Sequence, residues 1–250
     1  MQNEILLLVS LFLTFLTVVF LFWLFQEQGL YLWTVLATIA ANIEVLIMVT
    51  AFGMEMTLGN ILFASTFLVT DILSELYGKK AAQTAVYLGI ATSVIFIFLS
   101  QSWMLYVPNE NDFASPAIRT VFSNTPRLMA VGIIVYVIVQ LFDVWAYHKW
   151  WAFTKSRFGD SKKFLWLRNN GSTLVSQLLN TVLFTWGAFL GTYDTKTLIS
   201  IAIASYIIFV ATSIADTPFV YLARYLHQKK TGGSSLRKKP LTVMNARQTL

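Results

Sequence analysis

The sequence contains no cysteine, only two histidines and few charged residues. The absence of cysteine excludes disulfides, thiolate metal sites and cysteine nucleophiles. Charged residues make up 12% of the 250 residues, about half the share typical of a soluble domain, whereas hydrophobic residues make up 56%. A soluble fold of this length cannot bury so much apolar surface, and a disordered chain would be far more polar. The composition therefore argues against a soluble enzyme and against disorder.

Motifs that carry enzyme chemistry are also missing from the sequence. It has no glycine-rich phosphate-binding loop, no nucleophile motif and no set of metal-binding residues. His148 and His227 each stand beside basic residues at the end of an apolar run, as interfacial side chains do. The net charge of +6 is spread over loops and the C-terminal tail. We therefore expect a protein that is not an enzyme, has no cofactor or metal, and does not bind nucleic acid directly.

Long apolar runs dominate what is present. Residues 5–25 carry no charge, and at ~1.5 Å per residue they can span a hydrocarbon core of ~30 Å. Because no Lys or Arg precedes this run, we interpret it as a retained transmembrane helix and not as a signal peptide. The pattern predicts an all-α, polytopic membrane bundle in a single domain, residues 1–226, with spans at about 5–25, 30–52, 57–77, 81–107, 128–147, 172–190 and 198–226.

Basic residues mark three of the segments between these runs. They follow the third run, separate the fifth from the sixth, and follow the seventh. The mixed aromatic and basic residues 150–168 are typical of an interfacial loop or a short surface helix, and residues 227–250 of a flexible basic tail. Because cytoplasmic loops carry an excess of Lys and Arg, seven spans place the C-terminus in the cytoplasm and the N-terminus outside.

Five acidic residues lie inside the apolar runs. An ionised acid at the centre of a membrane helix costs about 2.5–3.5 kcal/mol on insertion scales. Such side chains are therefore expected to face the interior of the bundle or water. The five residues are Glu44, Asp71, Glu75, Asp143 and Asp216.

Helical spacing places several of these acids on shared polar stripes. Four runs each carry one such stripe, with the members Asp71, Glu75 and Lys79; Tyr136, Gln140, Asp143 and Tyr147; Thr173, Gln177 and Asn180; and Tyr206, Ser213 and Asp216. Structural explanations remain open for three acids: Glu75 could pair with Lys79, Asp143 could pair with Lys149, and Asp216 could satisfy backbone groups freed by Pro218. Packing explains Glu44 least well because its surroundings in the sequence are apolar.

An ordered series of motifs resembles the queuosine precursor transporter family, also called the vitamin-uptake-like family. The longest is residues 67–80 (FLVTDILSELYGKK). The others are 41–43 (ANI), 52–53 (FG), 57–59 (TLG), 62–63 (LF), 125–127 (TPR), 140–144 (QLFDV), 166–177 (WLRNNGSTLVSQ) and 216–221 (DTPFVY). The resemblance covers about residues 42–221 and rests on several ordered motifs, which makes it specific.

The resemblance implies a six-helix importer in the bacterial inner membrane, with residues 5–25 as an extra N-terminal helix. Its substrates are implied to be 7-deazaguanines: 7-cyano-7-deazaguanine, 7-aminomethyl-7-deazaguanine or queuine, salvaged for tRNA modification. A weaker similarity to the substrate-binding subunits of energy-coupling-factor transporters leaves a partner-driven alternative open, as well as another purine or vitamin as substrate. Proton coupling and a homo-oligomer are both compatible with the resemblance.

Three positions depart from the family pattern. Asn180 stands where many members carry Asp, and Phe209 and Ile47 stand where Lys is frequent. The loss of an Asp together with a Lys preserves net charge, as if a buried ion pair had been replaced by neutral groups. Glu44 is then a candidate for a compensating gain. The departures bear on the choice of substrate and on proton coupling.

We expect one central cavity to bind the substrate. Its predicted lining is Glu44, Asp71, Gln140, Asp143, Gln177, Asn180 and Asp216, with Tyr136 and Trp186 as stacking rings. A carboxylate of Glu44 or Asp71 would accept the N–H bonds of the ring's amidine-like edge, and Asn180 or Gln177 would bind its carbonyl edge. Residues predicted at gates or interfaces are Asn42, Glu75, Arg127, Arg168 and Asn169.

Overall fold

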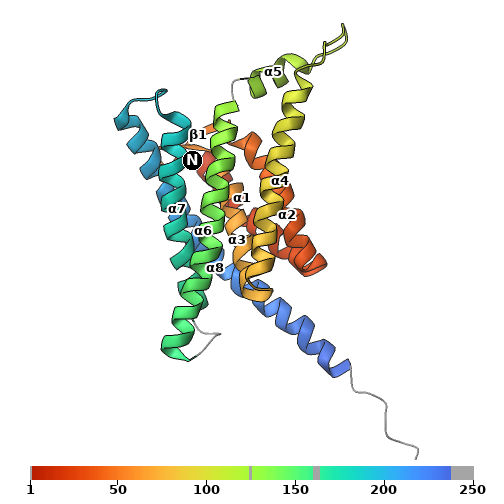
Figure 1. Ribbon diagram of the computed structural model, residues 1–250, viewed down its shortest axis with the longest axis vertical. Coiled ribbons are helices and arrows are strands. Elements are labelled where there is room, and N and C mark those ends of the chain that lie inside the picture. The colour runs from red at the N-terminus through yellow and green to blue at the C-terminus, as the bar shows by residue number, and fades with distance from the viewer. Residues whose placement is uncertain (1, 124–125, 160–163, 238–250) are drawn as a thin grey trace, which may run out of the picture.

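The computed structural model describes residues 2–123, 126–159 and 164–237, and in these ranges the chain is an all-α bundle with one small β-hairpin (Figure 1). The helices are α1 (Gln2–Phe25), α2 (Glu27–Glu44), α3 (Gly59–Leu76), α4 (Lys79–Trp103), α5 (Ser115–Ser123), α6 (Pro126–Phe158), α7 (Leu165–Phe189) and α8 (Thr195–Arg237). The strands are β1 (Met48–Ala51) and β2 (Met54–Thr57). Of the predicted features, Thr125, Lys162, Lys163 and the tail beyond 237 lie outside the described residues.

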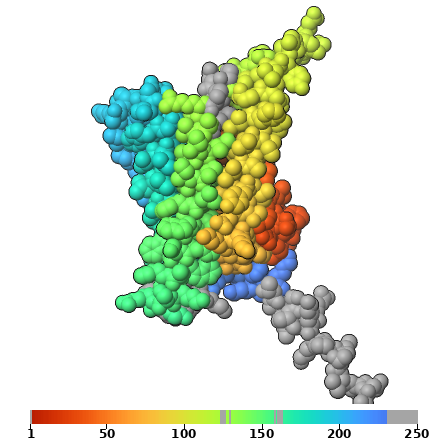
Figure 2. Space-filling view, in the orientation of Figure 1, coloured from red at the N-terminus to blue at the C-terminus, as the bar shows by residue number. Residues whose placement is uncertain are grey.

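Helix α3 is the central element of the bundle. It packs against α1, α2, α4, α6 and α8, and its side chains from Ala64 to Ser74 are all buried. The main apolar cluster joins Leu68 and Ile72 of α3 to Phe15 of α1 and Leu30 of α2. On the face shown in Figure 2, α6 (green) lies between α4 (yellow) and α7 (teal) and packs against both. A polar side chain on α3 must therefore find its partners inside the protein.

Within the residues that the structure describes, five helices are long and apolar enough to cross a membrane: Gln2–Phe25, Gly59–Leu76, Lys79–Trp103, Ala130–Arg157 and Thr195–Lys230. Many large apolar side chains on these helices are exposed, including Phe12, Phe98 and Ile214. Such a surface is stable against lipid, whereas its exposure to water would carry a large unfavourable free energy. The structure thus confirms a polytopic membrane bundle. α2 and α7 are less apolar, and the count of seven spans stays a prediction.

The bundle has two different ends (Figure 1). One, which we call the hairpin end, contains β1, β2, α5 and the N-terminus of α1. The other, which we call the basic end, contains the turn from α3 to α4, the C-terminal part of α6 and the projecting C-terminal part of α8. Lys79, Lys155, Arg157 and Arg224 lie toward the basic end. In the predicted orientation, the basic end faces the cytoplasm.

The second predicted span is wrong in its last residues. A helix was expected over 30–52, but α2 ends at Glu44 and residues 48–57 form an antiparallel hairpin. Phe52 and Gly53 both have positive φ, 53° and 72°. Two left-handed residues form the tight turn that joins hairpin strands. The β-branched residues Val49, Thr50 and Thr57 near this turn favour strands over a continued helix.

Two other boundaries also differ from expectation. The predicted interfacial segment 150–168 is mostly helical, because α6 continues to Phe158 and α7 begins at Leu165. The predicted flexible tail from 227 is helical as far as Arg237. Long basic and aromatic side chains can keep their polar ends in water while their helix projects from the apolar layer. A basic segment is therefore a poor signal for the end of a helix.

Candidate functional site

A cavity of about 330 Å³ opens among the helices at the hairpin end. This volume lies near the lower limit of pockets that hold small organic ligands. Its walls come from the C-terminal parts of α2 and α7, the hairpin, Ser93 of α4, and the N-terminal halves of α3, α6 and α8. The polar lining residues include Thr38, Asn42, Glu55, Thr57, Asn60, Thr66, Ser93, Asn180, Thr181, Thr185, Thr197 and Ser205.

Aromatic side chains line the cavity in two groups. Phe63 of α3 lies 6.2 Å from Tyr136 and 6.0 Å from Phe209, measured between ring centroids. Phe189 lies 5.9 Å from Phe184 and 5.7 Å from Tyr193 in the second group. Aromatic faces and edges of this kind favour a flat, conjugated ligand. Phe209, which stands where Lys is frequent in the family that the sequence resembles, belongs to the first group.

Tyr136 reaches its position because Gly89 of α4 has no side chain. A Cβ added at Gly89 would lie 2.1 Å from the Tyr136 hydroxyl oxygen. The Tyr136 side chain is buried and lines the cavity as predicted for a stacking ring. Trp186, the other predicted stacking ring, is half-buried and does not line the cavity in the described structure.

Three of the predicted residues line the cavity: Asn42, Tyr136 and Asn180. The amide nitrogen of Asn42 donates to the Thr38 carbonyl at 2.8 Å, and that of Asn180 donates to Gln177 Oε1 at 3.3 Å. These contacts leave the amide oxygens available to a ligand. Glu44 lies half-buried at the end of α2, off the cavity wall.

Gln140 connects the cavity to the interior of the bundle. Its Nε2 donates to Thr66 Oγ1 at 2.6 Å, and Thr66 lines the cavity. The Gln140 Oε1 atom is buried and has no hydrogen-bond partner in the described structure. Buried polar atoms are seldom left unpaired. An unpaired acceptor one residue from the cavity points to a water or a ligand group at this place.

Three buried carboxyl groups form what we call the acid layer: Asp71 of α3, Asp143 of α6 and Asp216 of α8. Each accepts from a neutral side chain on α7. Thr173 Oγ1 donates to Asp71 at 3.3 Å, Ser176 Oγ donates to Asp143 at 2.6 Å, and Asn169 Nδ2 donates to Asp216 at 2.9 Å. The pairings of Asp143 with Lys149 and of Asp216 with the proline-freed backbone are therefore not the ones observed.

Charge compensation in the acid layer is incomplete. Asp71 Oδ1 and Asp143 Oδ2 are buried without a partner in the described residues, and the hydrogen bonds from α7 to the three acids all come from neutral side chains. Three ionised carboxylates in such surroundings would be very costly, so protons must neutralise some of them. No three acidic or histidine side chains of the described residues converge as a metal site would require. The arrangement can hold protons and release them.

The cavity in the described structure does not bring together all the residues predicted to line it. Asp71, Asp143, Asp216 and Gln177 are buried away from the cavity wall, toward the basic end. Sequence spacing places residues on a shared helix face but gives little information on their depth along the bundle. Whether Glu44 or Asp71 binds the substrate stays a prediction.

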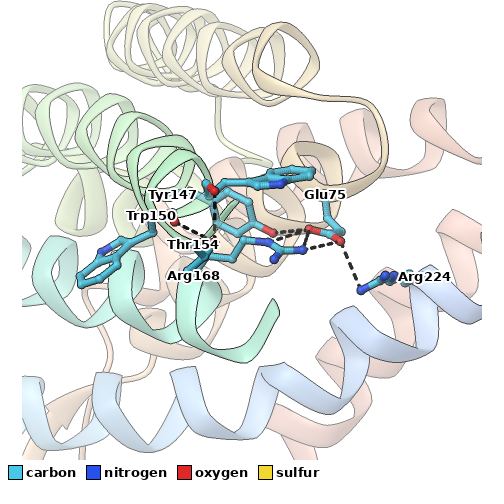
Figure 3. A network of polar contacts seen from close by, with 7 residues as sticks. Glu75, Tyr147, Trp150, Thr154, Arg168 and Arg224 are labelled. Carbon is cyan, nitrogen blue, oxygen red and sulfur yellow. Dashed lines mark hydrogen bonds and ion pairs between the residues drawn. The ribbon is translucent and has the colours of Figure 1, made fainter. Parts of the chain in front are cut away.

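A saturated ion-pair cluster occupies the basic end (Figure 3). The Arg168 guanidinium of α7 donates to both Glu75 oxygens, with Nη2 at 2.7 Å from Oε1 and 2.6 Å from Oε2. Tyr147 of α6 donates to Glu75 Oε2 at 2.9 Å, and Arg224 of α8 lies 3.5 Å from Oε1. Arg168 also lies over the Trp151 ring, 4.6 Å from its centroid. The cluster ties α3, α6, α7 and α8 together.

Glu75 pairs with Arg168 and not with Lys79, and the role of both residues at a gate or interface stays a prediction. Asn169 lies one residue further along α7, between the ion-pair cluster and the acid layer, and also contacts Thr217 Oγ1 at 3.3 Å. Arg127, predicted in the same group, lies at the hairpin end. It donates to the Gly187 carbonyl at 3.1 Å and to the Leu190 carbonyl at 2.8 Å, which satisfies acceptors at the C-terminal end of α7.

Sequence reasoning missed Glu55, Asn60 and Tyr193 as lining residues. Glu55 could have been found from the alternation of small or apolar and polar residues on either side of Phe52 and Gly53, which is typical of a hairpin. Asn60 and Tyr193 lie near helix ends, where no sequence periodicity marks which side chains face inward.

Comparison with known proteins agrees with this architecture. The family described as "Putative vitamin uptake transporter" matches residues 57–223. A protein from Bacillus subtilis (strain 168) named "Probable queuosine precursor transporter" is 37% identical over 200 residues, which is 80% of this chain and 85% of that protein. No solved structure matches significantly. The match to the family begins at Thr57 and so leaves out α1, α2 and most of the hairpin.

Proposed function

Because the chain belongs to the vitamin uptake transporter family, we propose that it imports a queuosine precursor of the 7-deazaguanine class across the bacterial inner membrane. The observation that carries this proposal is the aromatic and amide-lined cavity of about 330 Å³ at the hairpin end. Its size and lining suit one flat, nitrogen-rich ring. The similar protein from B. subtilis carries a name of the same meaning.

The cavity and the ion-pair cluster together correspond to one state of an alternating-access cycle. The cavity is open among the helices of the hairpin end, whereas Glu75, Arg168 and Tyr147 tie the helices together at the basic end. With the N-terminus outside and the C-terminus in the cytoplasm, this is an outward-facing state with a closed inner gate. Release of substrate inside then requires the bonds of Glu75 to separate.

Recognition follows from the groups on the cavity wall. The ring stacks on the aromatic group of Phe63, Tyr136 and Phe209, and the amides of Asn42 and Asn180 bind its polar edge. An amide offers both a donor and an acceptor, as the mixed edge of a deazaguanine requires. The unpaired Gln140 Oε1 offers a further acceptor close to the cavity wall.

Proton movement through the acid layer supplies the driving force in this proposal. Asp71 and Asp143 lie between the cavity and the inner gate, each with one oxygen free of partners in the described residues. Intramembrane carboxyl groups of this type form proton relays in transporters. Protonation from the outside lowers the charge of the layer, and release to the cytoplasm restores it after the substrate has left.

Expression of the chain alone tests the function. The host is a strain that can neither make queuosine nor take up its precursors, and the measurement is queuosine in tRNA after feeding each 7-deazaguanine separately. We expect restoration, and its loss when a protonophore is added. If queuosine still appears in tRNA when the protonophore is present, proton coupling is contradicted but the import function is not. Failure with every precursor, at normal membrane abundance, favours a substrate-binding subunit that needs an energising partner, or another purine or vitamin as substrate.

Reporter fusions test the orientation. A reporter fused after Asp112 is expected to give a periplasmic signal. A reporter fused after Gln228 is expected to give a cytoplasmic signal. If both report the same side, the seven-span arrangement is wrong.

A further inference from the structure

One side of the hairpin packs against α1 and the other carries Glu55, and the cavity is lined by hairpin residues from both sides: Met48, Glu55, Met56 and Thr57. In the register, Val49 is opposite Met56 and Thr50 is opposite Glu55. Successive residues of a strand point to opposite sides. Met56 and Ala51 belong to an apolar cluster with Leu7 of α1, so the side that carries Glu55 points the other way. Glu55 lies on the cavity wall.

Among the residues that line the cavity in the described structure, Glu55 is the one with a charged side chain. Every other polar lining residue is an amide, a hydroxyl or a phenol. Glu55 is also solvent-exposed. Its carboxylate therefore does not carry the desolvation cost that the buried carboxyl groups of the acid layer carry. A negative charge is therefore available at the mouth of the cavity before any ligand enters.

The N-terminal residues of α1 hold the hairpin in place from outside. Asn3 Nδ2 donates to the Thr50 carbonyl at 2.9 Å, and the Phe52 backbone N–H donates to Glu4 Oε1 at 3.3 Å. Thr50 is the cross-strand partner of Glu55. These contacts and the apolar cluster behind the strands hold in place the side of the hairpin that carries Glu55. Glu55 is therefore part of a preorganised wall.

We infer that Glu55 is the carboxylate that accepts the paired N–H bonds of the substrate's amidine-like edge and so selects for a ring that carries a 2-amino group. The inference rests on the proposed function and names the group that gives it selectivity. A carboxylate can accept two parallel N–H bonds from one edge of a ring. Asn42 and Asn180 then bind the remaining polar groups, and the buried acids are left to carry protons.

Binding to the purified full-length protein in detergent tests the inference. The probes are 7-cyano-7-deazaguanine and its counterpart without the 2-amino group, measured by calorimetry. Wild-type protein is expected to prefer the 2-amino compound. Glu55→Gln presents an amide N–H where an acceptor is needed, so its Kd for that compound should rise about 10- to 100-fold. Its Kd for the counterpart should change far less.

Two further variants keep the result interpretable. Glu55→Asp retains the carboxylate and should recover part of the preference for the 2-amino compound. Glu110→Gln removes an exposed carboxylate on the loop beyond α4, away from the cavity wall, and should bind as wild type does. If Glu55→Gln keeps both the affinity and the preference of wild type, the assignment of Glu55 is wrong although the function stands. If wild type binds neither compound nor any other 7-deazaguanine, the proposed function fails and the assignment fails with it.

Discussion

The two ends of the bundle treat polar side chains in opposite ways. At the basic end the charges of Glu75 and Arg168 are matched by short, repeated hydrogen bonds. At the hairpin end the polar groups are mostly neutral, singly bonded and exposed to a cavity. Saturated polar groups hold helices together, whereas unsaturated ones are ready to exchange water for a ligand. In the proposed transport cycle, this difference distinguishes a closed basic end from a hairpin end that is prepared to bind the substrate.

The largest effect is expected from Arg168→Ala. The substitution leaves the buried Glu75 carboxylate without its bidentate partner, and breaking such a pair costs about 3–5 kcal/mol. The melting temperature of the detergent-solubilised protein should fall steeply. The melting temperature of Arg168→Lys should lie between those of wild type and Arg168→Ala, because Lys keeps the positive charge but makes no bidentate contact and stacks poorly on Trp151.

Arg224→Ala is the matched control for this prediction. Arg224 is partly exposed and 3.5 Å from Glu75, so its removal should cost less than about 1 kcal/mol. Equal destabilisation by Arg168→Ala and Arg224→Ala would mean that the basic end is not held by the Arg168 pair.

Neutral substitutions in the acid layer should abolish concentrative uptake. Asp71→Asn and Asp143→Asn keep the shape of the side chain and one acceptor oxygen but cannot carry a proton. Uptake should fall to that of cells without the protein, at unchanged membrane abundance, because the mutated groups no longer titrate. Glu44→Gln carries the same expectation from the sequence. Normal uptake by all three variants would show that none of these carboxyl groups takes part in transport.

A smaller effect is expected from Gly89→Ala. The added Cβ would lie 2.1 Å from the Tyr136 hydroxyl oxygen, so the ring must shift and narrow the cavity. Overpacking of this kind costs about 1–3 kcal/mol, and the KM for uptake should rise. Gly132→Ala, where the nearest atom is 3.9 Å away, should leave the melting temperature unchanged or slightly higher. Equal loss of stability in both variants would argue against a special role for the close approach at Gly89.

The smallest effect concerns the exposed start of α8. The Asp194 carboxylate accepts from the Thr197 hydroxyl and from the backbone N–H groups of Lys196 and Thr197. These hydrogen bonds, led by that of the Thr197 side chain, lower the pKa of Asp194 below its usual value. The contribution of Asp194 to stability is therefore present at neutral pH and is lost as pH falls through the folded-state pKa.

Melting curves of wild type and Asp194→Ala across pH check this expectation. The small difference in melting temperature between the two proteins at pH 7 should shrink once the pH is well below the ordinary Asp pKa of about 3.9. A difference that stays constant with pH would mean that the carboxylate charge does not matter at this cap.

Much of the architecture follows from the sequence because lipid imposes simple rules. Apolar runs such as residues 5–25 predict helices, and the cost of buried charge predicts that Asp71 and Asp143 face inward. The hairpin was not predicted, because residues 30–52 form a mostly apolar run that is long enough to be interpreted as one span, and the weak alternation on either side of Phe52 and Gly53 was overlooked. The depth of each polar group along the bundle depends on how α7 is rotated and shifted against its neighbours. The pairing of Glu75 with Arg168 in place of Lys79 has the same origin. Local sequence patterns do not encode this placement.

The turn between α1 and α2 bears on how the chain enters the bilayer. One residue, Gln26, separates the two helices, and its side-chain and backbone N–H groups both donate to the Phe22 carbonyl. A Cβ at Gly29 would lie 2.2 Å from the Leu21 carbonyl oxygen, so the helices meet at a spacing that only glycine allows. Such a pair has almost no connecting polar backbone to carry into the lipid. If α2 spans the membrane as predicted, we expect the first two helices to integrate together as one helical hairpin, with the cavity wall on α2 braced by α1 from the start.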